Sequence, residues 1–291
     1  MSAPHIIFDR ELLRERRHRA VKSGAVRFLL ERTVEELLER LGTIARTFPQ
    51  AALVETPDAE ALKAKLLASG KIGAIDIRGI EGAEESLENK STQYDLAISL
   101  LSMQWLNDLP GVLAQIKRVL KPDGLLLAAM IGGDTLTELR DALASAESEV
   151  EGGISPRVSP FVEVRTLGGL LQRAGLALPV TDLDRVTARY ANALELMRDL
   201  RRMGAANALI ERSRKPLRRA TLFRAIDIYR ERHADADGRV RATFEILWLS
   251  GWAPHESQQQ PARPGSAKAR LADALRAIEL PAGEKAGPKK N

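Results

Sequence analysis

The segment from Tyr94 to Leu139 restricts the possible folds of this chain more than any other part. A short apolar run at 96–101 leads into an amphipathic helix, and the KPDG turn at 121–124 opens a second apolar run at 125–131. Both runs are apolar on both faces, as strands of a parallel sheet are when helices cover the two sides. The segment therefore predicts a β-α-β unit.

Alternating strands and helices continue on both sides of this unit. Further strands are expected at 51–54, 72–77, 180–189 and 240–249, with the last one antiparallel. Helices are expected at 8–19, 25–46, 164–174, 194–203 and 216–232. Two more are expected to start at a cap: one follows Asp58 or Thr56, and the other runs from Asp134 as N-cap to Glu149. Between Arg78 and Gln93 the pattern allows at most one short helix, at 84–89. The result is an open α/β sheet, whose ligands lie beyond the carboxyl ends of the strands.

The length of 291 residues permits three parts, which we expect at 1–50 (a helical cap), 51–255 (an α/β domain) and 256–291 (an extended tail, disordered beyond 277). The chain has no cysteine, which excludes disulfides, zinc-thiolate sites, iron-sulfur clusters and a cysteine nucleophile. No run is apolar enough to span a bilayer, and the N-terminus lacks a secretory apolar region. A cytoplasmic location is expected.

The net charge of +5 is small, but two segments are locally basic, Arg10 to Arg19 and Arg212 to Arg224. Either segment could contact an acidic partner or phosphate, or could be a solvated helix face. Only 4% of the residues are aromatic, so stacking platforms for single-stranded nucleic acid are scarce. Nucleic acid is an unlikely partner, and an RNA-binding protein is therefore the third choice of function.

Several short blocks together resemble one family. They are FDR at 8–10, SMQWLNDLP at 102–110, KPDG at 121–124, GGDTL at 132–136, SPRVSPF at 155–161 and HESQ at 255–258. The chain resembles the class I methyltransferases that use S-adenosylmethionine. Within them it is similar to the methyltransferase-like assembly factors of respiratory complex I, the arginine-hydroxylase type, and to their bacterial relatives. The resemblance extends from residue 8 to about residue 270, with one gap.

This resemblance implies a Rossmann-like open sheet with N-terminal helical caps, S-adenosylmethionine as cofactor, and a complex I subunit as protein partner. Members of the group are described as hydroxylating an arginine on such a subunit. The blocks GGDTL, SPxxSPF and HESQ are the specific part of the match, whereas KPDG occurs in many methyltransferases.

The gap in the resemblance falls on the cofactor loop. The stretch Leu53 to Glu60 has none of the glycines that let the backbone approach the cofactor, and Pro57 removes a backbone donor. Asp58 and Glu60 add negative charge where the carboxylate of the cofactor would bind. Only residues 77–93 then precede the next core strand, which is short for a β-α-β crossover. We therefore expect a degenerate loop, disfavoured cofactor binding and one missing sheet element.

Candidate site residues follow from the strand ends and from the family blocks. If cofactor binding is retained, its residues are expected to be Glu55, Thr56, Asp76, Ser102 and Trp105. The candidates for contact with a substrate or partner are Asp134, Arg157 and His255. Each has a plain structural alternative: a strand-end polar residue for Asp76, core packing for Trp105, a helix cap for Asp134 and an exposed arginine for Arg157. No histidine has ligand spacing for a metal, and no catalytic residue can be named.

Two functions remain open at this point. The favoured one is a methyltransferase-family protein of the complex I assembly-factor type, which acts on or holds a protein partner and could be a pseudoenzyme. The alternative is an active S-adenosylmethionine-dependent methyltransferase.

Overall fold

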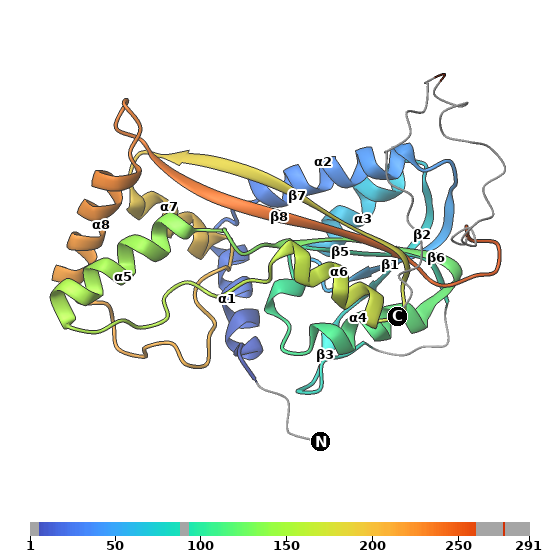
Figure 1. The fold of residues 1–291 in the computed structure, drawn as a ribbon, viewed down its shortest axis with the longest axis horizontal. Helices are drawn as coiled ribbons and strands as arrows, with labels where there is room; N and C mark the ends of the chain where they lie inside the picture. The colour runs from blue at the N-terminus through green and yellow to red at the C-terminus, as the bar shows by residue number, and fades with distance from the viewer. Residues whose placement is uncertain (1–5, 88–92, 260–275, 277–291) are drawn as a thin grey trace, which may run out of the picture. The chain divides into compact units, whose positions relative to one another are not determined.

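The computed structural model describes residues 6–87, 93–259 and 276, and the chain divides into two compact units, 1–255 and 256–291. In the first unit, the main sheet has the strand order β2-β1-β5-β6-β8-β7 over the described residues (Figure 1). Its strands are β1 (Phe48–Val54), β2 (Ile72–Arg78), β5 (Tyr94–Leu100), β6 (Leu120–Ile131), β7 (Ala177–Tyr190) and β8 (Val240–Trp252). Strands β2, β1, β5 and β6 are parallel, and β8 pairs antiparallel with both β6 and β7. The prediction of an open α/β sheet with an antiparallel final strand is confirmed.

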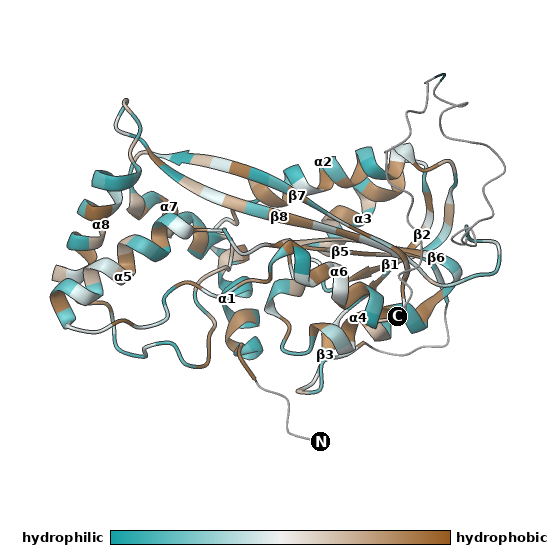
Figure 2. Ribbon diagram, viewed as in Figure 1, coloured by the Kyte–Doolittle hydropathy of each residue, from teal (hydrophilic) through white to brown (hydrophobic). Residues whose placement is uncertain are grey.

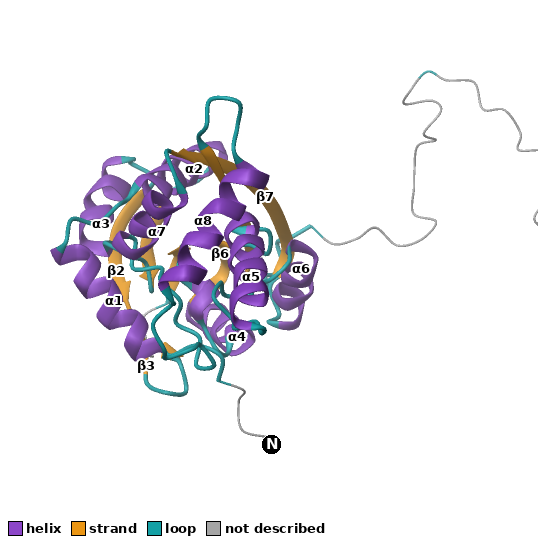
Figure 3. Ribbon diagram, turned by 90° about the vertical axis from the view of Figure 1, so that its left-hand side faces the viewer, coloured by secondary structure: helices purple, strands orange, loops and turns teal. Residues whose placement is uncertain are grey.

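Helices cover both faces of this sheet (Figures 2 and 3). They are α1 (Arg10–Lys22), α2 (Phe28–Thr43), α3 (Ala59–Ala68), α4 (Leu109–Val119), α5 (Thr137–Glu151), α6 (Val164–Arg173), α7 (Ala193–Arg202) and α8 (Arg219–His233), with a 3-10 turn η1 at Met103–Trp105. Alternate strand residues belong to different cores. Leu53 and Ile98 pack in the core with α2 and α3, whereas Ala52 and Ala97 pack in the core with α4 and α6. This two-sided burial explains why the central strands are uniformly apolar.

The strands β7 and β8 form a long antiparallel pair, from Ala177 opposite Trp252 to Tyr190 opposite Val240. Helices α5, α7 and α8 gather near one end of this pair, and α5 packs against α8 (Figures 1 and 3). Phe244 and Trp248 of β8 are buried in the same core as Tyr229 of α8. The pair thus holds this helical layer beyond the ends of β5 and β6.

Three details differ from the sequence-based expectations. The segment after β2 forms a small antiparallel hairpin, β3 (Ile80–Glu81) with β4 (Ser86–Leu87), and not a short helix; residues 88–89 of that expected helix lie outside the described residues. The KPDG turn lies within β6 as an irregularity of its register with β5. The described part of the 78–93 segment adds no strand to the main sheet.

The third difference concerns the two expected helix caps. Asp58 occupies the N-cap position of α3, but its side chain makes no capping hydrogen bond. Helix α5 starts at Thr137 with Leu136 as N-cap, so the N-cap interpretation of Asp134 is wrong. The carboxylates of Asp58 and Asp134 accept hydrogen bonds from arginines, which a local capping rule does not consider.

No helix among the described residues is long and apolar enough to cross a membrane. The predicted tail beyond 277 lies outside the described residues, and the division into a cap, a domain and a tail stays a prediction.

Candidate functional site

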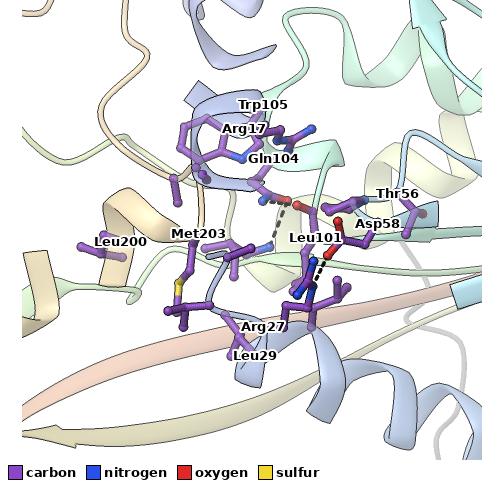
Figure 4. A pocket seen from close by; sticks show the side chains of 18 of the residues that line it. Arg17, Arg27, Leu29, Thr56, Asp58, Leu101, Gln104, Trp105, Leu200 and Met203 are labelled. Carbon is purple, nitrogen blue, oxygen red and sulfur yellow. Dashed lines mark hydrogen bonds and ion pairs between the residues drawn. The ribbon is translucent and has the colours of Figure 1, made fainter. Parts of the chain in front are cut away.

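A cavity of about 490 Å³ lies at the carboxyl ends of β1, β2, β5 and β6, where a ligand of an open α/β sheet is expected. Most of its lining is apolar and comes from α1, α2, α7 and the strand ends. Figure 4 shows Arg17, Arg27, Thr56, Asp58, Gln104 and Trp105 around this space. Among the described residues that line it, Glu55, Thr56 and Trp105 belong to the predicted cofactor set.

The block Phe8-Asp9-Arg10 fixes the start of α1 beside the cavity. The Asp9 carboxylate accepts a hydrogen bond from Leu12 N at 3.0 Å and caps the helix. Phe8 packs edge-on against Trp105, with 5.4 Å between the ring centroids. The Asn107 side-chain oxygen accepts hydrogen bonds from the backbone of residues 7 and 8, both at 2.8 Å. The family blocks at 8–10 and 102–110, which are far apart in the sequence, are therefore in direct contact.

Arg10 strengthens this contact through ion pairs with two carboxylates. Its guanidinium lies 2.7 Å from Glu55 and 3.4 Å from Glu85, and all three side chains are largely buried. Glu85 also accepts hydrogen bonds from Asn107 N at 2.8 Å and Asp108 N at 2.7 Å. The β3–β4 hairpin thereby places a buried carboxylate against the N-terminal helix. Glu55 accepts a further bond from Ile80 N at 2.9 Å.

Arg17 follows Arg10 by about two turns of α1 and reaches the cavity (Figure 4). Among the described residues, its guanidinium donates a hydrogen bond to Ser102 Oγ at 3.2 Å. Burial lowers the pKa of Arg17 to about 10, and the nearby carboxylate of Glu55 counteracts this shift. The guanidinium is therefore cationic at neutral pH, in a largely apolar wall.

The turn after β1 keeps a glycine-like backbone without glycine. Glu55 and Asp58 have φ values of 43° and 51°, in the left-handed region that favours glycine. Thr56 Oγ1 accepts a hydrogen bond from Leu100 N and donates one to Val54 O, both at 3.1 Å. The Asp58 carboxylate accepts from Arg27 of the segment before α2. The side-chain polar groups of Thr56 and Asp58 are thus engaged within the protein.

Asp76, the candidate for ribose binding, lies within β2 and is not one of the described residues that line the cavity. Its carboxylate accepts a hydrogen bond from Tyr94 Oη at 3.0 Å and one from Arg78 at 3.3 Å. Burial raises the pKa of Tyr94, although its bond from Arg78 opposes that shift. Ile77 and Arg78, at the end of β2, line the cavity instead.

The GGDTL block ties β6 to β8. A Cβ on Gly132 would lie 2.6 Å from the Glu245 carboxylate and 2.7 Å from Leu247 Cγ, so a side chain at 132 would clash. Thr135 Oγ1 accepts from Glu245 N at 2.9 Å, and Leu136 N donates to Thr243 O at 2.8 Å. Asp134 is exposed and pairs with Arg185 of β7 at 2.6 Å.

The SPRVSPF loop is held by a buried carboxylate of α5. Glu147 accepts hydrogen bonds from Ser155 N at 2.8 Å, Ser155 Oγ at 2.7 Å and Arg157 Nε at 2.7 Å. Burial raises the pKa of Glu147, but these hydrogen bonds and the Arg157 charge outweigh it, so the pKa lies below its usual value. Phe161, at the end of the loop, packs edge-on against Trp105 with centroids 5.8 Å apart.

A family described as a methyltransferase domain matches residues 35–179. The "Arginine-hydroxylase NDUFAF5, mitochondrial" of Danio rerio is 40% identical over 286 residues, which cover 92% of this chain and 89% of that protein. The chain belongs to this family of methyltransferase-domain proteins.

Two further relatives show lower sequence identity to this chain. The protein of the same name from Homo sapiens is 38% identical over 90% of this chain and 81% of its own length. A "Malonyl-[acyl-carrier protein] O-methyltransferase" of Laribacter hongkongensis is 34% identical over 73% of this chain and 71% of its own length.

Within this family framework, the predicted site residues fall into separate places. Ser102 is buried behind Arg17, and Trp105, with 6% of its surface exposed, is both a core residue and part of the cavity wall. His255 is exposed after β8 and is not among the described residues that line the cavity. Over the described residues, no group of histidine and carboxylate side chains could hold a metal ion. The assigned binding roles stay predictions.

Sequence reasoning missed Arg17, Arg27 and Glu85 as parts of the site. Arg17 and Arg27 come from N-terminal helical segments whose charges resemble ordinary solvated faces. The family block at 8–10 was the available signal, because an anchored helix start implies that the rest of that helix lies over the site.

Proposed function

We propose that this chain is a family member of the complex I assembly-factor type, which acts on or holds a protein partner without binding S-adenosylmethionine in the manner usual for its fold. The carboxylate of Asp76 carries this proposal, because Tyr94 and Arg78 already use it at 3.0 and 3.3 Å. Both donors bond to Oδ2, one of them is cationic, and Asp76 is not among the described residues that line the cavity, so a ribose in the cavity would have to compete with them for this carboxylate.

The turn after β1 supports the same conclusion. In the fold, this turn offers backbone N–H groups to the cofactor, but here Pro57 has no N–H and Asp58 adds a carboxylate. The pairing of Asp58 with Arg27 further closes the turn from the α2 side. The residues of this turn therefore do not fit the carboxylate end of S-adenosylmethionine, and we derive no methyl-transfer step.

The cavity itself favours the alternative, an active S-adenosylmethionine-dependent methyltransferase. About 490 Å³ of mostly apolar space remains where the family binds its ligand, with Arg17 as a cation for a carboxylate. A cofactor held by Arg17 and the Trp105 wall would bypass Asp76. The two candidates therefore differ in one measurable property, the affinity for the cofactor.

Isothermal titration of the full chain with S-adenosylmethionine and with S-adenosylhomocysteine separates them. We expect no saturable heat, with the malonyl-carrier-protein methyltransferase relative as positive control. A micromolar dissociation constant would overturn the proposed loss of cofactor binding and favour the alternative.

The assembly role has its own test. Deletion of the gene in the source cells should reduce assembled complex I on native gels, and the tagged protein should recover complex I subunits. A normal amount of complex I in the deletion strain contradicts the assembly role. Recovery of RNA or ribosomes with the tagged protein favours an RNA-binding function instead. The cytoplasm stays the compartment that we propose for this activity.

A further inference from the structure

A second hollow, of about 620 Å³, adjoins the first and is here called the arginine groove. It lies between α1, α5, α7, the 157–161 loop and the segment 205–217. The apolar part of its lining includes Leu139, Leu143, Val158, Met197 and Leu217, which are here called its floor. Trp105, Leu136, Phe161, Leu200 and Ala205 line both hollows, so the groove is the neighbour of the cavity across the Trp105–Phe161 contact.

Five arginines line this groove: Arg16, Arg157, Arg201, Arg212 and Arg214. The two basic segments of the sequence, far apart in the chain, supply three of them. Each segment contacts residues that flank the other, since Arg212 bonds to Asp9 at 3.3 Å and Arg16 donates to the backbone carbonyls of residues 206 and 207. Arg16, Arg212 and Arg214 of the two basic segments thus belong to one surface.

Carboxylates compensate only part of this charge. Arg157 pairs with Glu147 and Arg212 pairs with Asp9. Arg201 and Arg214 are exposed and make no ion pair with any residue that the structure describes. Burial, followed by the charges of Arg212 and Arg19, lowers the pKa of Arg16, as expected for crowded cations. An excess of positive charge therefore faces the groove.

We infer that the arginine groove binds an acidic segment of a protein partner, with carboxylates on Arg201, Arg214 and Arg16 and an apolar side chain on the floor. The inference rests on the proposed function in one respect, that the partner is a protein. Complementary charge steers such a segment to the groove, and burial of the apolar side chain supplies affinity. The segment would then lie next to Trp105.

The shape of the groove favours a peptide over RNA. Base stacking needs exposed aromatic faces, but Trp105 is packed between Phe8 and Phe161 at interplanar angles of 81°. The floor offers aliphatic side chains instead, which suit leucine or phenylalanine side chains. The groove also disfavours a cationic segment, because each added positive charge would meet uncompensated guanidinium groups.

Fluorescence anisotropy with the full chain tests this inference. The probe is a short fluorescein-labelled peptide in which glutamates flank a central leucine. Two comparison peptides carry glutamine or lysine in place of glutamate, and a labelled oligouridylate represents RNA. The groove variant is Arg201→Glu/Arg214→Glu. Its matched control is Arg165→Glu/Arg173→Glu on α6, which has the same charge change on exposed arginines outside the groove.

We expect saturable binding of the glutamate peptide that weakens with salt, and little binding of the other peptides. The groove variant should bind about ten-fold more weakly or worse, whereas the control variant should bind within about two-fold of the wild type. Equal losses in both variants, preferential binding of oligouridylate, or no binding of the glutamate peptide would overturn the inference. Thermal melts of both variants verify folding.

The result is independent of the cofactor titration. Binding of S-adenosylmethionine would change the proposed function and leave the peptide result unaffected. Loss of peptide binding with normal complex I recovery would reject the groove alone.

Discussion

The Arg10 guanidinium lies 2.7 Å from the Glu55 carboxylate and joins the first turn of α1 to the end of β1. The two side chains are only 9% and 16% exposed. Glu55 follows the first strand directly, where a methyltransferase commonly has the acidic residue of its cofactor turn. In this chain that carboxylate binds Arg10 and the backbone of Ile80, so it holds the N-terminal helix over the cavity.

Glu55→Gln should lower the free energy of unfolding by about 2 kcal/mol, because the largely buried Arg10 guanidinium then keeps only the Glu85 carboxylate, at 3.4 Å, as a charged partner. Urea denaturation measures the effect. Glu15→Gln is the matched control, since the Glu15–Arg19 pair is 70% and 67% exposed and its loss should cost less than about 0.5 kcal/mol. Equal effects in the two variants would contradict the structural role of Glu55.

Gly204→Ala should destabilise the protein by about 2–3 kcal/mol. Gly204 has a φ of 69°, and a Cβ there would lie 2.9 Å from Arg17 Cα, which is backbone that cannot turn aside. Thermal or urea unfolding provides the measurement. Gly169→Ala in α6 is the control, with no atom near the new Cβ, and should raise stability by up to about 1 kcal/mol.

The positions of the main strands were predictable because apolar runs and turns are local signals, and the two-sided cores agree with them. The β3–β4 hairpin was not, because the polar run around Glu85 resembles a helix. Its structure depends on Arg10, Asn107 and Asp108, which are distant in the chain. Asp134 failed as a cap for a similar reason. Gly132 packs closely against β8, and the helix α5 begins only at Thr137. Asp134 therefore lies before the helix, where it forms an ion pair with Arg185.

Glu147→Gln should destabilise the protein at neutral pH, and the difference from wild type should shrink in acid. The folded pKa of Glu147 lies below its unfolded value of about 4.3. Its contribution is therefore complete above about pH 4.3 and is lost as the pH falls through the folded pKa. At pH 7 we expect a cost of about 3 kcal/mol. Urea titrations at several pH values measure it, and a difference that does not change with pH would contradict it.

Asp58→Gly should not produce S-adenosylmethionine binding. The change removes a carboxylate and a left-handed aspartate, but Pro57 still lacks its N–H, and Asp76 stays engaged by Tyr94 and Arg78. Isothermal titration of the variant, beside the wild type, is the measurement. A saturable response in the variant alone would show that Asp58 was the single obstacle, and would reject the role that we assign to the Asp76 contacts.

The part of the site that sequence could not reveal is its cation. Arg17 resembles any other arginine of a basic helix, and only the docking of Phe8 against Trp105 turns it toward Ser102. A burial that depends on such long-range contacts leaves no periodic signal in the sequence. The apolar strand ends, by contrast, placed the cavity correctly.

Arg17→Met should stabilise the protein by about 1 kcal/mol at pH 7 while weakening any anionic ligand of the cavity, because a partly desolvated cation with one neutral partner is costly. Its folded pKa of about 10 lies below the usual value of an arginine, so the unfolded chain binds more protons in the window between the two pKa values. The wild type should therefore gain stability as the pH rises through this window, and the variant should lack that component of the gain.

Arg19→Met, at an exposed position of the same helix, should change stability by less than about 0.5 kcal/mol. Urea denaturation of the three proteins compares them. A loss of stability in Arg17→Met would show instead that the bond to Ser102 and the packing of the side chain stabilise the fold, and that the cation is not held there for a ligand.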